Sequence, residues 1–91
     1  MKHTIRDQLE RASISIPLNI AEGNGKFTDK DKCKFFDIAR GSAMECAACV
    51  DILLAKNEIE EIRASQLKSA LNEIVRMLVG LIRSTSKTRT Y

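Results

Sequence analysis

The sequence predicts an all-α fold, an up-down antiparallel helical bundle, on three observations. The 91 residues include one Pro and four Gly, so turn formers are scarce. Aromatic residues, which sheets favour, make up only 4% of the chain. Apolar residues recur every three or four positions over three long stretches. We expect one domain over residues 1–84, with helices at about 4–23, 28–55 and 61–84, and a basic flexible tail over 85–91.

The first predicted helix begins after Thr4, which forms an approximate capping box with Asp7. Pro17 lies inside the helix and lacks an N–H group, so we expect a kink there. Glycines at 23 and 25 end the helix. The apolar stripe of this helix consists of Ile5, Leu9, Ala12, Ile16 and Ile20.

The second predicted helix begins at Thr28, with Asp31 three residues later in the same capping pattern. Its middle is rich in Gly, Ser and Ala. A glycine inside a helix costs about 1 kcal/mol relative to alanine, and we expect a neighbouring backbone to approach closely at Gly41. The wide apolar face comprises Phe35, Phe36, Ile38, Ala39, Ala43, Cys46, Ala47, Val50, Leu53 and Leu54.

The third predicted helix carries a seam of alternating four- and three-residue spacing, which is typical of packed helices. A chain of this length forms a marginal core by itself. We therefore expect the protein to form a homo-oligomer. The seam consists of Leu67, Leu71, Ile74, Leu78 and Leu81, and Val75 and Ile82 widen it.

Cysteine chemistry does not fit a metal site or a disulfide framework. Cys46 and Cys49 lie one helical turn apart, but only Cys33 and the single histidine, His3, could complete four zinc ligands. Three cysteines are an odd number, and the first residues contain no apolar signal region. We interpret the cysteines as small buried apolar residues of a cytoplasmic protein, and we expect no metal and no cofactor.

Catalytic groupings of acid, base and nucleophile are absent from the sequence, so we expect no enzymatic activity and no small-molecule substrate. One internal charge pair has two interpretations. Arg40 lies in an apolar setting and needs a carboxylate, for which Glu22 is the candidate. We favour a structural ion pair over a recognition or catalytic pair.

Positive charge is concentrated at the end of the chain. Residues 76–91 contain four basic and no acidic side chains, within a net charge of +3 for the whole chain. No apolar run approaches the ~18 residues of a membrane span, so no membrane partner is expected. The cluster predicts nucleic-acid binding through phosphate contacts by Arg76, Arg83, Lys87 and Arg89.

Two stretches of the chain form long and specific motifs. Residues 11–23 contain an uninterrupted Ser-Ile-Pro-Leu-Asn-Ile-Ala-Glu-Gly. Residues 35–45 read Phe-Phe-Asp-Ile-Ala-Arg-Gly-Ser-Ala-Met-Glu. Both resemble the signatures of the four-helix-bundle proteins encoded in intervening sequences of bacterial 23S ribosomal RNA genes, and the resemblance extends over about residues 5–83. The signature residues are Pro17, Asn19, Glu22, Gly23, Arg40, Gly41, Ser42 and Glu45.

The resemblance implies an up-down bundle, a homopentamer and no established enzymatic activity. It also implies a similarity in fold to the accessory proteins of diversity-generating retroelements. Family members carry a further helix before the first signature, so this chain matches helices two to four of the family bundle. Two functions follow as hypotheses. The first is an oligomeric protein that binds RNA or another nucleic acid through a basic surface. The alternative is a protein-interaction scaffold that receives a partner helix in an apolar groove.

Overall fold

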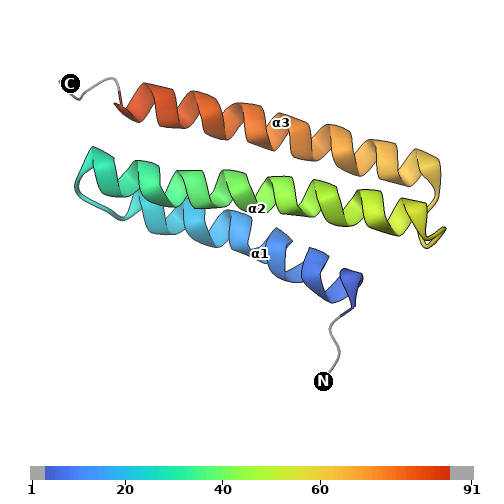
Figure 1. Cartoon of the computed structure of the whole chain (residues 1–91). Helices are drawn as coiled ribbons and strands as arrows, with labels where there is room; N and C mark the ends of the chain where they lie inside the picture. Colours follow the sequence, from blue (N-terminus) through green and yellow to red (C-terminus); the bar gives the residue numbers. More distant parts are fainter. Residues whose placement is uncertain (1–3, 87–91) are drawn as a thin grey trace.

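The computed structural model describes residues 4–86, which form three helices (Figure 1). They are α1 (Ile5–Asn24), α2 (Asp29–Ala55) and α3 (Glu61–Ser86), and no strand occurs in the described residues. The predicted all-α fold with three helices is confirmed. The flexible tail was predicted to begin at residue 85, but Thr85 and Ser86 belong to α3. Residues 87–91 lie outside the described part of the chain.

Local capping sets the start of the first two helices. The Thr4 hydroxyl accepts a hydrogen bond from the Asp7 N–H, and the Asp7 carboxylate accepts one from the Thr4 N–H, both at 3.1 Å. The Thr28 hydroxyl accepts from the Asp31 N–H at 3.1 Å. Both predicted caps are therefore present. Helix α1 continues through Pro17 as a single helix.

Helix α2 is the centre of the fold. Consecutive helices run in opposite directions, and α1 and α3 pack against α2 rather than against each other (Figure 1). Most of the fully buried side chains therefore come from α2, including Phe36, Cys46, Val50 and Leu53. None of the helices in the described residues is long and apolar enough to cross a bilayer.

The glycine that permits close packing is Gly23, which lies against the Phe36 ring, and, contrary to the prediction, no neighbouring helix of the chain approaches Gly41. A Cβ atom at Gly23 would lie 2.6 Å from the Phe36 ring, whereas a Cβ at Gly41 would have no neighbour within 4 Å. The reason is helical rotation. Ala39 and Ala43 are completely buried against the other helices, and Gly41, midway between them, lies on the opposite side of α2.

An apolar groove of about 440 Å³ separates α1 from α3. It forms because both outer helices pack on α2 and leave their facing edges apart. The lining contains residues of the seam predicted for the third helix, together with Pro17 and Met77. Its residues are Ile16, Pro17, Ile20, Ile74, Met77, Leu78 and Leu81.

Candidate nucleic-acid interface

The predicted basic cluster is only partly retained in the structure. Arg76 and Arg83 are exposed on α3, seven residues and therefore two turns apart. The Arg76 guanidinium donates to the Glu73 carboxylate at 2.9 Å, which offsets its charge. Arg83 is in none of the ion pairs between described residues. Lys87 and Arg89 lie outside those residues.

The fold brings lysines near Arg83 that the sequence alone did not group with it. Because α2 and α3 are antiparallel, the start of α2 lies beside the end of α3 (Figure 1). A contact joins them there: the Cys33 thiol donates to the Ile82 carbonyl at 3.7 Å. We call residues 22–35 and 82–86 the basic end. It contains five cations and three carboxylates, a net charge of +2. The cations are Lys26, Lys30, Lys32, Lys34 and Arg83.

Two of these lysines are held by neighbouring groups of the same connection. The Lys26 ammonium forms an ion pair with Glu22 at 3.1 Å. Lys32 donates to the Asn24 carbonyl at 3.3 Å. Lys30 is exposed and, like Arg83, takes part in no ion pair within residues 4–86. Lys30 and Arg83 are therefore the cations with the least internal compensation.

Two phenylalanines at the basic end have different surroundings. The half-buried Phe35 ring has the Lys26 and Lys34 ammonium groups 5.1 and 5.7 Å from its centroid, in cation–π geometry. Phe27, in the loop between α1 and α2, is 100% exposed. Phe27 directly precedes Thr28, the N-cap of α2. An apolar residue at this position commonly packs against an apolar side chain at the fourth residue of the helix. In α2 the fourth residue is Lys32, so this apolar contact does not form.

The predicted ion pair between Arg40 and Glu22 is absent. Two guanidinium nitrogens of Arg40 donate to the Asp37 carboxylate at 2.8 and 2.9 Å. Glu22 pairs instead with Lys26. The physical reason is proximity along the chain: Asp37 and Arg40 are three residues apart on one face of α2, and Lys26 follows the end of α1 four residues after Glu22. Both pairs are substantially exposed and contribute little to stability.

Two signature residues form a polar bridge between α1 and α2. The Ser15 and Ser42 hydroxyls lie 2.8 Å apart. The Asn19 amide donates to the Ser15 carbonyl at 2.8 Å and to its hydroxyl at 2.9 Å. This network gives Asn19 and Ser42 a structural role in aligning the two helices.

Cys46 and Cys49 are buried thiols. Burial raises the pKa of both; the neighbouring Cys49 and then Glu45 raise that of Cys46 further, and Glu45 raises that of Cys49. The thiols are therefore neutral near pH 7. Within residues 4–86, no three His, Cys, Asp or Glu side chains are grouped to hold a metal ion. His3 lies outside these residues.

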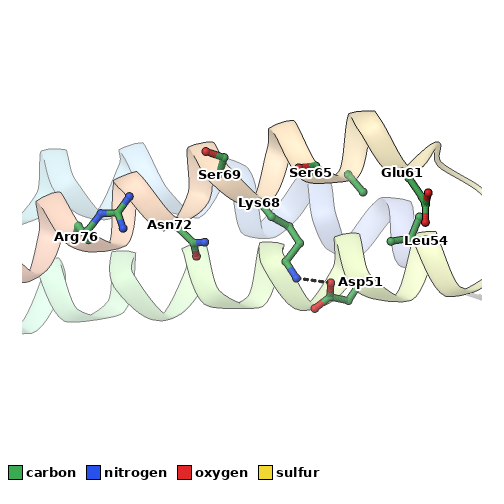
Figure 2. Close-up of a pocket in the computed structure, with 9 residues that line it drawn as sticks. Asp51, Leu54, Glu61, Ser65, Lys68, Ser69, Asn72 and Arg76 are labelled. Atoms are coloured by element: carbon green, nitrogen blue, oxygen red, sulfur yellow. Dashed lines mark hydrogen bonds and ion pairs between the residues drawn. The ribbon is translucent and has the colours of Figure 1, made fainter.

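A polar pocket of about 500 Å³ lies between α2 and α3 (Figure 2). Lys68 reaches from α3 to the Asp51 carboxylate on α2 at 2.7 Å (Figure 2). The other polar groups are hydroxyl, amide and charged side chains along α3, including Ser65, Asn72 and Arg76. The lining contains two carboxylates, Asp51 and Glu61, and two cations, Lys68 and Arg76, so its charges balance.

Comparison with known proteins gives one match. A family model described as 23S rRNA-intervening sequence protein matches residues 1–80. The match includes both signature stretches and the lysines of the α1–α2 connection. Searches of curated proteins and of solved structures find no match.

Proposed function

The chain belongs to the 23S rRNA-intervening sequence protein family, and we propose that it is a non-enzymatic helical-bundle protein that binds RNA through the basic end. The observation that carries this proposal is that Arg83, at the end of α3, lies at the same end of the bundle as four lysines of the α1–α2 connection and the start of α2. Phosphate contacts by such cations give binding that is salt-dependent and weak in sequence preference.

Within residues 4–86, the thiols and the ion pairs support a non-enzymatic role. Cys46 and Cys49 are buried and Cys33 is partly buried. The exposed ion pairs include pairs three or four residues apart and the Lys68–Asp51 pair between α2 and α3. The three cysteines fit a reducing compartment, so we propose a cytoplasmic location.

Filter binding of a structured RNA over a series of salt concentrations tests the proposal. The Lys30→Gln and Arg83→Gln variants should bind more weakly than the wild-type protein. Each lost phosphate contact should reduce the slope of log K against log salt by about 0.7–0.9. Arg63→Gln is the matched control, because Arg63 is also exposed and unpaired on α3, at the opposite end.

Two results would contradict RNA binding at the basic end. One is an affinity that does not change with salt. The other is an equal loss of affinity in Arg63→Gln and Arg83→Gln, because net charge rather than position would then be responsible. Unfolding midpoints should be compared first, since Arg83 lies in the last turn of α3, where a cation stabilises the helix.

We also propose that the three helices correspond to helices two to four of a four-helix bundle and that the protein assembles as a homo-oligomer, a pentamer by family resemblance. The exposed apolar residues support assembly: Met77 and Leu81 at the groove, and Ile14 and Leu18 on α1. Light scattering tests this directly, with a fivefold mass expected and a monomeric mass contradicting it.

The groove between α1 and α3 supports a second candidate function, a scaffold that binds a partner helix. Its α3 edge repeats at spacings of three and four residues, the pattern by which one helix packs on another. Met77→Lys should abolish capture of such a partner, whereas Ile62→Lys, at a similarly exposed position on α3, should not. The α3 edge consists of Ile74, Met77 and Leu81, with Leu78 beside them.

A further inference from the structure

An aromatic ring that is completely exposed in a lysine-rich loop needs a specific explanation. Phe27 has 100% exposure, the highest of the large apolar residues. Its loop is short and is closed on both sides by helix caps. The Gly25 N–H donates to the carbonyls of Ala21 and Glu22 on one side, and Thr28 caps α2 on the other. These bonds hold the backbone around Phe27.

The surroundings of Phe27 favour a negatively charged ligand over an apolar protein surface. Its sequence neighbours within three residues are Asn24, Gly25, Lys26, Thr28, Asp29 and Lys30, none of which is a large apolar residue. A buried protein interface instead needs a contiguous apolar centre. Residues 26–34 contain four lysines and two aspartates, a net charge of +2, which complements phosphate.

The chemistry of a single exposed ring beside cations is that of a base-stacking position. Each unpaired base has a π face that stacks on an aromatic side chain without sequence preference, while lysines contact the adjoining phosphates. A base inside a duplex stacks on its neighbours and has no free face. Phe35 does not provide this position, because its half-buried ring already has two ammonium groups near it.

We propose that Phe27 stacks on one unpaired base of a single-stranded RNA segment and that Lys30 contacts a phosphate beside it. This inference rests on the proposed RNA binding and deepens it, because it assigns a preference for unpaired over paired RNA. The exposed Phe27 side chain contributes nothing to the folded core. Substitutions there should therefore leave the unfolding midpoint unchanged.

The test compares an unstructured oligouridine with a fully paired RNA duplex as probes. Phe27→Ala should weaken oligouridine binding about five- to hundredfold, the effect of losing one base–aromatic stack, and should change duplex binding less than about twofold. Phe27→Leu keeps an apolar side chain without a π face and should resemble Phe27→Ala. Phe27→Tyr should retain the wild-type affinity. Ile62→Ala, another exposed apolar position, should bind both probes like the wild-type protein.

A fluorescent variant gives a readout that does not depend on affinity. The chain contains no tryptophan, so Phe27→Trp has a single indole at the proposed position. Oligouridine should quench its emission, and the duplex should not.

Unchanged oligouridine affinity in Phe27→Ala, or no quenching in Phe27→Trp on bound oligouridine, would overturn the stacking inference while RNA binding at the basic end stands. If the wild-type protein binds neither probe at low salt, the proposed function itself is overturned.

Discussion

The two ends of the bundle differ in packing and in charge. At the basic end, α1 lies so close to α2 that only glycine fits at position 23 against Phe36. At the far end, residues 4–11 and 56–63, α1 diverges from α2 (Figure 1). At the far end, an exposed contact joins α1 to the α2–α3 connection: the Arg6 guanidinium donates to the Glu58 carbonyl at 2.8 Å. The far end has a net charge of −1, against +2 at the basic end.

This difference shows that close packing and positive charge coincide at the α1–α2 connection. The basic end has a glycine packed against the Phe36 ring, whereas an exposed polar contact joins Arg6 to Glu58 at the far end. Substitutions along the bundle should reproduce this gradient.

The largest effect is expected for Gly23→Ala at the basic end. The new Cβ would lie 2.6 and 2.9 Å from two ring carbons of Phe36, so α1 or the ring must move. Overpacking of this kind costs about 1–3 kcal/mol. The free energy of unfolding in urea should fall by that amount. An unchanged value would mean that the ends do not differ in packing.

The matched substitution Gly41→Ala should change the free energy of unfolding in the opposite direction. A Cβ at this position has open space, and alanine is favoured over glycine inside a helix by about 1 kcal/mol. The free energy of unfolding should therefore rise by up to ~1 kcal/mol. A loss of stability would indicate that Gly41 contacts another copy of the chain in an assembly.

A smaller effect on the free energy of unfolding is expected above neutral pH, from two thiols in the central part of α2. Burial raises the pKa values of Cys46 and Cys49 above 9.0, so the folded protein retains thiol protons that the unfolded chain releases. The contribution of the protonated thiols to the free energy of unfolding is fully present below about pH 9 and is lost as the pH rises further. Urea unfolding at several pH values should show this decline, and it should be weaker in a Cys46→Ala, Cys49→Ala variant.

The smallest effect is expected for Arg6→Ala at the far end. Arg6 and Glu58 are 65% and 41% exposed and 3.9 Å apart, and exposed pairs contribute about 0.2–1 kcal/mol. Global stability should change by less than ~1 kcal/mol. Amide hydrogen exchange should become faster in the first turns of α1. A global loss as large as that of Gly23→Ala would remove the contrast between the two ends.

Some contacts that were not predicted from the sequence nevertheless have partial signals in it. Arg40 and Asp37 have the three-residue spacing that favours pairing on one helix, and Glu22 and Lys26 are four residues apart across the end of α1. Phe27 lies between a helix stop and a cap, with Lys32 where an apolar partner would be needed. The grouping of Arg83 with these lysines had no such signal, because they lie about fifty residues apart.

The sequence by itself determined the three helices, their caps and the family. These features depend on residues three or four positions apart and on contiguous signatures, so a single chain segment is sufficient to specify them. Only the tertiary structure decided that Gly23 rather than Gly41 allows close approach, and that the basic end brings Arg83 to the lysines. Both depend on how each helix is rotated and aligned against α2, which follows from the packing of the whole core around Phe36, Ala39 and Ala43.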